Sequence, residues 1–226
     1  MLADRIEVLL EPFLHGSSTP DGEGTETAAQ PLSSRQLADI SMYIDMLLRW
    51  NTRVNLTSIR DPEAIVTRHF GESLFVAQDL FGRLAGAQAF DFSHVIDVGA
   101  GAGFPGLPIK IWEPRIHLTL IESNQKKVAF LREVVRGLGL EDVTIRCSRA
   151  EELSLSGDIV TLRAVERFEQ VLPVACGLIG MRGQIALLIG ENQVESARNL
   201  GTGLRWQTPI ELPQSGTRVL LKGFRV

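Results

Sequence analysis

The chain has few of the residues that build disulfides or metal sites. Its 226 residues include two cysteines and four histidines. Neither cysteine lies in a recognisable motif, so we expect both in the core of a protein of the reducing cytoplasm. The histidines show no spacing typical of zinc ligands, and we therefore expect no metal. The residues concerned are Cys147, Cys176, His15, His69, His94 and His117.

Long apolar runs are also missing. No stretch has the length needed to cross a bilayer. Residues 1–14 alternate charged and apolar side chains, which predicts an amphipathic helix and not a secretory signal. We therefore expect no membrane partner.

The chain lacks an excess of positive charge. Its 23 Lys and Arg residues face 27 Asp and Glu residues, a net charge of −4. This balance excludes a whole-molecule attraction to nucleic acid, so any such binding needs a local basic patch. A hydrophobic content of 44% permits a sizeable core, and the length fits one large domain or one domain with an appendage.

The order of predicted elements indicates an α/β fold preceded by helices. Apolar spacing predicts helices over 33–50 and 63–81, and the stretch 16–31 predicts a flexible loop. Strands and helices then alternate, with strands at 94–98, 117–121, 143–147, 158–162 and 184–189 and helices near 105–112, 124–138, 168–179 and 191–199. Segments 204–212 and 217–225 predict a C-terminal antiparallel hairpin. We predict a helical extension over 1–90. Over 91–226 we predict a doubly wound Rossmann-like sheet that resembles the S-adenosylmethionine (SAM) methyltransferase fold.

The most informative stretch is residues 95–106, Val-Ile-Asp-Val-Gly-Ala-Gly-Ala-Gly-Phe-Pro-Gly. An apolar strand containing Asp97 leads to three alternate glycines, Gly99, Gly101 and Gly103, which let a ligand approach the backbone closely. The amides at the start of the following helix favour polar or anionic groups. The pattern predicts a cofactor that contains adenosine.

Two cofactors fit this loop. Residues 101–106 match the dinucleotide pattern G-x-G-x-x-G, with Glu122 about 20 residues further on. However, Asp97 two residues before the first glycine is typical of SAM methyltransferases. Pro105 also removes an amide where a dinucleotide loop enters its helix. SAM is therefore favoured over NAD(P), and a glycine turn without a ligand is the third alternative.

Polar residues follow three further strands. Glu122 is a candidate ribose acceptor, or it belongs to a helix cap with Ser123 and Asn124. Ala150 and Glu151 follow the third strand, where such folds hold adenine; the alternative is a solvated acidic pair, Glu151–Glu152. Arg163 ends the fourth strand and faces either the ligand crevice or solvent.

Two segments are locally basic despite the negative net charge. The candidates for contacts with RNA phosphates are Arg53, Arg60, Arg68, His69, Lys126 and Lys127. The two lysines fit a solvated helix face equally well.

Two motifs of nucleic-acid methylation are absent. No Asn-Pro-Pro-Tyr-like sequence occurs, which disfavours methylation of an exocyclic amine. No Pro-Cys nucleophile occurs, which disfavours the covalent route to a pyrimidine C5.

Five stretches together resemble the RsmG (GidB, glucose-inhibited division protein B) family. They are Trp-Asn-Thr-Arg-Val-Asn-Leu-Thr-Ser-Ile-Arg-Asp at 50–61, Arg-His at 68–69, residues 97–108, Lys-Lys-Val-Ala-Phe-Leu-Arg at 126–132 and Arg-Ala at 163–164. The resemblance runs from about residue 32 to the C-terminus. It implies a bacterial methyltransferase that uses SAM to modify N7 of a guanine in 16S ribosomal RNA, free or in a small-subunit precursor. We expect it to be a cytoplasmic monomer.

The resemblance also implies the residues that contact SAM. These are Gly99, Phe104, the segment 122–124, the pair 150–151, and Arg163. Relatives usually carry Asp where Glu122 stands, and Lys where Ile189 stands.

The expected target bears on the mechanism. N7 of neutral guanine already offers a lone pair, so no general base is needed and we assign no catalytic residue. Arg163 is a candidate for holding SAM or the guanine. A non-catalytic RNA-binding module that takes SAM or a nucleotide, and an NAD(P) oxidoreductase, are the alternatives.

Overall fold

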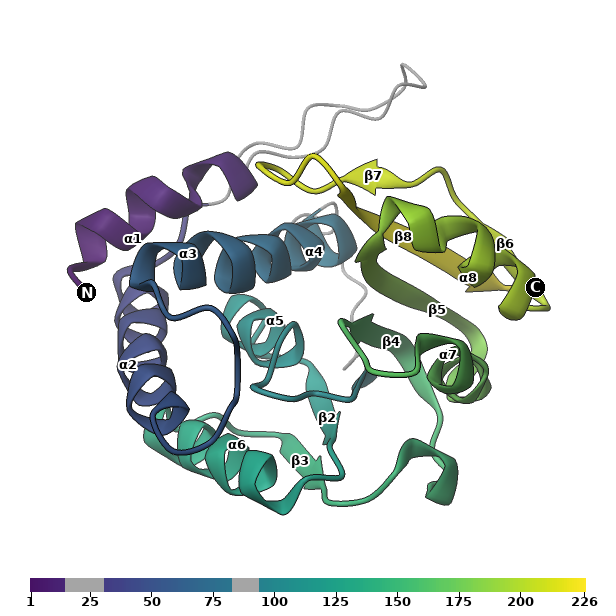
Figure 1. Cartoon of the computed structure of the whole chain (residues 1–226), viewed down its shortest axis with the longest axis horizontal. Helices are drawn as coiled ribbons and strands as arrows, with labels where there is room; N and C mark the ends of the chain where they lie inside the picture. Colours follow the sequence, from purple (N-terminus) through teal and green to yellow (C-terminus); the bar gives the residue numbers. More distant parts are fainter. Residues whose placement is uncertain (15–30, 83–93) are drawn as a thin grey trace.

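The computed structural model describes residues 1–14, 31–82 and 94–226, which form an eight-stranded sheet between two layers of helices (Figure 1). The predicted flexible loop near 16–31 lies, except for Pro31, outside the described residues. The strands are β1 (His94–Val98), β2 (His117–Ile121), β3 (Val143–Arg146), β4 (Gly157–Arg163), β5 (Ile179–Gly190), β6 (Leu204–Trp206), β7 (Ile210–Glu211) and β8 (Arg218–Arg225).

The sheet has the order β3-β2-β1-β4-β5-β8-β6, with β7 also paired to β8. Strands β1 to β5 run parallel, and β8 runs antiparallel to β5, β6 and β7. The predicted fold class is therefore confirmed. The first arm of the predicted hairpin is split into β6 and β7, which pair with opposite ends of β8. The strand order reverses between β1 and β4, and open α/β sheets bind ligands at such a switch point.

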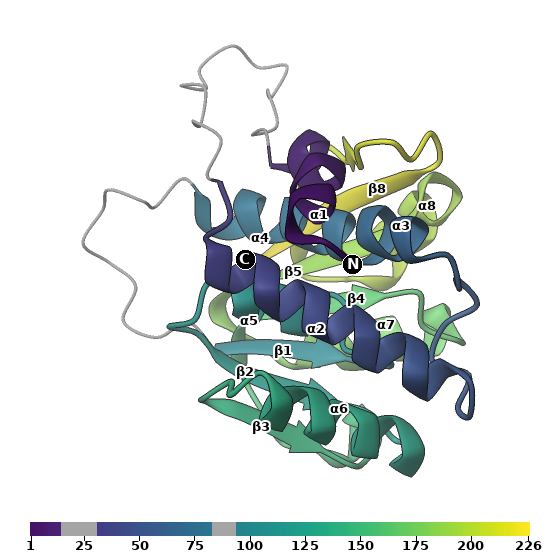
Figure 2. The same cartoon turned by 90° about the vertical axis from the view of Figure 1, so that its left-hand side faces the viewer.

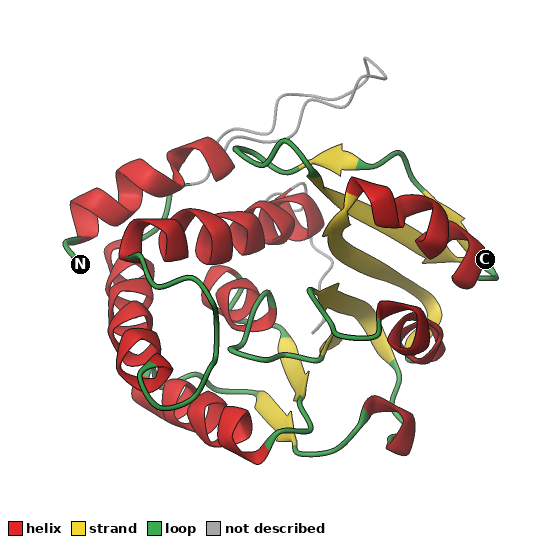
Figure 3. Cartoon of the chain, in the orientation of Figure 1, coloured by secondary structure: helices red, strands yellow, loops and turns green. Residues whose placement is uncertain are grey.

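Helices cover both faces of the sheet (Figure 3). One layer contains α1 (Ala3–Leu10), α2 (Ser34–Asn51), α3 (Pro62–Ile65), α4 (Glu72–Phe81), α5 (Gly106–Trp112) and α6 (Gln125–Gly137). The other layer contains α7 (Phe168–Gly177) and α8 (Val194–Leu200). Each layer packs on the sheet through its own cluster of buried apolar residues.

The N-terminal helices share the core of the first layer. Helix α2 begins with a capping box between Ser33 and Gln36, which satisfies backbone amides at its start. Its buried side chains, including Ile40 and Leu47, belong to the same apolar cluster as those of α5 and α6. Figure 2 faces this layer and shows α2 running along it, with α6 below.

The predicted helix over 63–81 contains a π-helical turn. Asp61 caps its start by accepting a hydrogen bond from the Ala64 amide at 2.7 Å. Helix α3 then passes into a π-helical turn (Val66–Gly71), which leads directly into α4. Such turns are rare and occur often at functional sites. This one carries Arg68 and His69.

Candidate functional site

The glycine loop after β1 has the backbone conformation that its sequence predicts. Gly99, Gly101 and Gly103 have φ values of +69°, +57° and +90°, a region that other residues rarely adopt. At Gly99 a Cβ would also lie 2.8 Å from Cγ1 of Val165, so a side chain is excluded there by contact as well. At Gly101 the same atom would meet only Gly99 O, at 3.7 Å. The requirement for glycine is therefore stricter at Gly99 than at Gly101.

Asp97 lies beneath this loop. Its side chain is buried and accepts hydrogen bonds from Thr161 Oγ1 at 2.8 Å and from the Gly106 amide at 3.1 Å. Burial raises the pKa of Asp97 to about 7, against the lowering effect of these two hydrogen bonds. These contacts tie β1 to β4 and to the start of α5. Asp97 thus supports the glycine loop by joining the elements on either side of it.

Glu122 lies at the end of β2 and holds two backbone segments. One carboxylate oxygen accepts from the Gly101 amide at 2.9 Å, and the other accepts from the Asn124 amide at 2.7 Å. The cap of α6 is Asn124, whose Oδ1 accepts from the Lys126 amide at 2.9 Å. Glu122 therefore links the glycine loop to the segment before α6, the two parts of the predicted cofactor site.

A pocket of about 670 Å³ opens at the carboxyl ends of β1, β2 and β4. This volume lies within the range of small-molecule sites. Six of the predicted cofactor residues line it: Gly99, Glu122, Ser123, Asn124, Ala150 and Glu151. Lys127, predicted for RNA, lines it too. The buried carboxylate oxygens of Glu122 suit the ribose of SAM as hydrogen-bond acceptors. The loop at Gly99, which tolerates no side chain there, lets SAM approach the protein backbone closely.

One wall of the pocket was not predicted. It is the segment 164–167 after β4, in which Ala164 and Arg167 have φ values of +47° and +57°. Between them, Val165 packs against Gly99. Left-handed conformations in residues with side chains cost free energy and cluster at functional sites. No sequence signal marks them, because neither residue is Gly or Asn.

Phe104 does not line the pocket. Its buried ring stacks on His69, with centroids 4.7 Å apart, and on Tyr43, at 5.4 Å. The Tyr43 hydroxyl donates to the carbonyl of Ala102 in the glycine loop. Gly103 lies against Tyr43 as well, and it also does not line the pocket. Phe104 and Gly103 thus fasten the loop to α2 and the π-helical turn.

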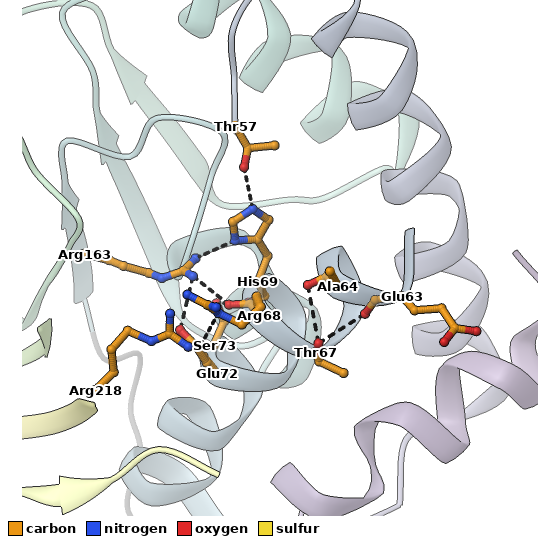
Figure 4. Close-up of polar contacts among 10 residues, drawn as sticks. All are labelled: Thr57, Glu63, Ala64, Thr67, Arg68, His69, Glu72, Ser73, Arg163 and Arg218. Atoms are coloured by element: carbon orange, nitrogen blue, oxygen red, sulfur yellow. Dashed lines mark hydrogen bonds and ion pairs between the residues drawn. The ribbon is translucent and has the colours of Figure 1, made fainter. Parts of the chain in front are cut away.

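Arg163 does not line the pocket. Its side chain reaches into an ionic cluster (Figure 4). Its guanidinium lies 3.2 Å from Glu72 Oε2 and donates to the carbonyl of Arg68 at 2.6 Å. Arg68 Nε lies 3.3 Å from Glu72 Oε1, and Arg218 of β8 pairs with the same oxygen. We call Glu72, Arg68, Arg163 and Arg218 the Glu72 cluster.

His69 is neutral and has a defined tautomer. Arg163 Nη1 lies 3.1 Å from His69 Nδ1, and a guanidinium has only donors, so Nδ1 accepts. The proton is therefore on Nε2, which donates to Thr57 Oγ1 at 2.8 Å. Burial, with the charges of Arg163 and Arg68, lowers the pKa of His69 to about 3.

The remaining RNA candidates lie outside the pocket. Arg53 and Arg60 are exposed in the segment between α2 and α3, and Lys126 is exposed at the start of α6. Arg68 is half-exposed and belongs to the Glu72 cluster.

Two expected absences concern metals and membranes. Among residues 1–14, 31–82 and 94–226, no group of three His, Cys, Asp or Glu residues is placed to hold a metal ion. Within the same ranges, no helix is long and apolar enough to span a membrane.

Comparison with known proteins identifies the family. Residues 36–208 match the GidB family, described as rRNA small subunit methyltransferase G. The chain belongs to this family. It is 38% identical over 203 residues to the ribosomal RNA small subunit methyltransferase G of Roseiflexus castenholzii, covering 84% of this chain and 83% of that protein. It is 34% identical over 212 residues to the protein of that name from Chloroflexus aggregans, covering 88% and 86%. The family predicted from the sequence is thus confirmed.

Solved structures agree on the fold of this GidB family member. The magnesium protoporphyrin IX methyltransferase of Synechocystis, solved with bound SAM, superposes with a TM-score of 0.59 at 13% identity. The match covers 83% of this chain and 97% of that one. This chain therefore shares its fold with that protein over most of its length.

Proposed function

We propose that this protein transfers a methyl group from SAM to N7 of a guanine in 16S ribosomal RNA. The observation that carries the proposal is the pocket at the switch point, where Gly99, Glu122 and Ala150 meet in a chain of the rRNA small subunit methyltransferase G family. The substrate is free RNA or a small-subunit precursor. The protein acts on it as a monomer in the cytoplasm.

Different residues of the pocket would contact different parts of the cofactor. Glu122 would hold the ribose, residues 150–151 would hold the adenine, and the loop at Gly99 would admit the methionine part. Asn124 and Ser123 border the ribose end. When bound, SAM supplies an electrophilic methyl group on a sulfonium.

The chain's own residues supply positioning, and two candidate proton acceptors among the described residues, His69 and Asp97, are already engaged in hydrogen bonds. His69 donates through Nε2 and accepts through Nδ1, so neither nitrogen is free to take a proton. Asp97 is buried under the loop and already accepts two hydrogen bonds. Because guanine N7 carries a lone pair, alignment of N7 with the methyl group suffices. In favourable cases such positioning contributes about 7 to 11 kcal/mol.

Two measurements test the proposal. Calorimetry compares the affinities for SAM, S-adenosylhomocysteine and NAD; the proposal requires the first two to bind and NAD to bind more weakly. The purified protein is then incubated with methyl-labelled SAM and 16S rRNA from cells that lack the gene. We expect label in N7-methylguanosine after digestion and mass analysis. Label in an exocyclic amine or a ribose, or tighter binding of NAD, would overturn it.

A further inference from the structure

The Glu72 cluster carries a net positive charge. Three guanidiniums, those of Arg68, Arg163 and Arg218, surround the single carboxylate of Glu72. The carboxylate is 1% exposed, so water does little to screen it. One carboxylate holds together three cations that would otherwise repel one another, and two positive charges remain.

The groups around the cluster do not cancel this excess. His69 carries no charge, because its pKa is lowered to about 3. Lys222 pairs with Asp79, so this neighbouring pair on β8 and α4 is neutral. Asp97 is close enough to favour the charged form of Arg163, but with a pKa of about 7 it carries only part of a charge at neutral pH.

Two of the three arginines reach the surface. The side chain of Arg68 is 46% exposed and that of Arg218 is 21% exposed, whereas Arg163 is 11% exposed. The Nε of Arg218 is buried and has no hydrogen-bond partner in the part of the chain that the structure describes. The cluster therefore presents guanidinium donors on its Arg68–Arg218 side and keeps Arg163 inside.

The Glu72 cluster is connected to both the cofactor pocket and the basic segment after α2. Arg163 is followed by Ala164 and Val165, which line the pocket. On the other side, Thr57 bonds to His69 and fixes the segment that carries Arg53 and Arg60 (Figure 4). An RNA strand that extends from this segment toward the methyl group would therefore pass the cluster.

We propose that the Arg68–Arg218 side of the Glu72 cluster is a binding site for one backbone phosphate of the RNA, next to the target guanine. The proposal rests on the proposed function and assigns Arg218, which the sequence did not single out. Guanidinium forks match phosphate oxygens in a bidentate geometry. The buried carboxylate of Glu72 orients the forks in advance, so that little side-chain freedom is lost on binding.

The carboxylate of SAM is the alternative anion for these arginines. The test therefore measures RNA and cofactor binding separately. The variants are Arg68→Gln and Arg218→Gln, alone and together. The control is Arg205→Gln, which removes the same charge from the exposed surface of β6. Affinity for 16S rRNA is measured at several salt concentrations with S-adenosylhomocysteine saturating, and the affinity for S-adenosylhomocysteine alone is measured by calorimetry.

Each single variant should bind RNA about tenfold more weakly, as expected for the loss of a charge-assisted hydrogen bond. Its slope of log affinity against log salt should fall by about 1. S-adenosylhomocysteine should bind all variants within about twofold of the wild type, which also shows that they are folded. Arg205→Gln should leave RNA binding unchanged.

Two results would overturn the phosphate site. One is a loss of S-adenosylhomocysteine affinity with RNA affinity unchanged, which would assign the cluster to the cofactor carboxylate. The other is an equal loss of RNA affinity in Arg205→Gln, which would indicate a diffuse charge effect. Failure of the proposed function is a separate observation: the wild-type protein would then place no methyl group on guanine N7.

Discussion

The cofactor pocket and the Glu72 cluster lie on two sides of the carboxyl end of β4 and are built in different ways. On the pocket side, backbone amides, glycines and the Glu122 carboxylate surround an open volume, and most of these residues lie in short contiguous stretches. On the other side, the Glu72 cluster surrounds a buried carboxylate and joins Glu72 to Arg163 and Arg218, 91 and 146 residues further along the chain. The pocket side is shaped to admit a ligand. The cluster side is held by paired charges and joins the π-helical turn and α4 to β4 and β8.

The largest expected effect is on the cluster side. Glu72→Ala would leave three buried or half-buried guanidiniums without their carboxylate. We expect the free energy of unfolding to fall by about 3 to 5 kcal/mol. Denaturant titration measures this change. Glu195→Ala is the matched control, because Glu195 pairs with Arg198 while 78% exposed and should change stability little. A loss for Glu72→Ala no larger than the control would show that the cluster does not hold the fold.

The next largest effect concerns cofactor binding by the glycine loop on the pocket side. Gly99→Ala should weaken S-adenosylhomocysteine binding by roughly 2 to 4 kcal/mol, because a Cβ meets Val165 in a backbone region that disfavours side chains. Gly101→Ala has a similar φ, but its Cβ would meet only Gly99 O at an ordinary contact distance of 3.7 Å, and it should lose less. Calorimetry compares the two. Equal losses would mean that conformation alone, and not contact with Val165, requires glycine at Gly99.

A smaller effect is expected at Glu122. Glu122→Gln should weaken S-adenosylhomocysteine binding by about 1 to 3 kcal/mol, since charge-assisted hydrogen bonds are lost. Glu122→Asp retains the carboxylate and should recover part of the loss. RNA affinity in the absence of cofactor serves as the control and should not change. If Glu122→Gln binds as tightly as the wild type, the carboxylate serves only the Gly101 and Asn124 amides.

The smallest effect concerns His69. With a pKa of about 3 it stays neutral from pH 5 to 9, so the methyl-transfer rate with saturating RNA and SAM should show no ionisation of His69 there. His69→Ala should lower this rate by less than about tenfold, against the ~10²–10⁴-fold expected for a lost general base. A rate that rises with pH in the wild type and becomes flat in His69→Ala would contradict this role.

The same lowered pKa affects stability. Because the pKa of folded His69 lies below the ordinary 6.5, the stability linked to this group is present in full above pH 6.5. It decreases as the pH falls toward 3. His69→Ala should therefore unfold with a weaker dependence on pH between 6.5 and 3, as measured by denaturant titration at several pH values.

The sequence was sufficient for the parallel part of the fold. Alternating apolar runs placed β1, β2, β3 and β4 within a few residues, and three glycines marked the loop that the structure shows with positive φ. Strand β5 is longer than predicted because it begins at Ile179 and includes residues 180–183. This glycine-containing stretch interrupts the apolar pattern.

Features that depend on distant contacts were not predictable. The π-helical turn has the apolar spacing of an ordinary helix. The partners of Arg163 come from the π-helical turn and from α4, and its side chain does not line the pocket that the end of a strand suggested. The family resemblance implies that Phe104 contacts the cofactor. In this structure its ring faces Tyr43 and His69. Its placement in a cofactor site remains a prediction.

Hydrogen–deuterium exchange of the wild-type protein tests the division between the two sides most directly. With S-adenosylhomocysteine alone, amides of residues 99–103, 122–124 and 150–151 should exchange more slowly, and those of the exposed segment 52–61 should be unchanged. Adding 16S rRNA should then slow exchange at 52–61. Protection of 52–61 by S-adenosylhomocysteine, with no change around the glycine loop and Glu122, would contradict the account.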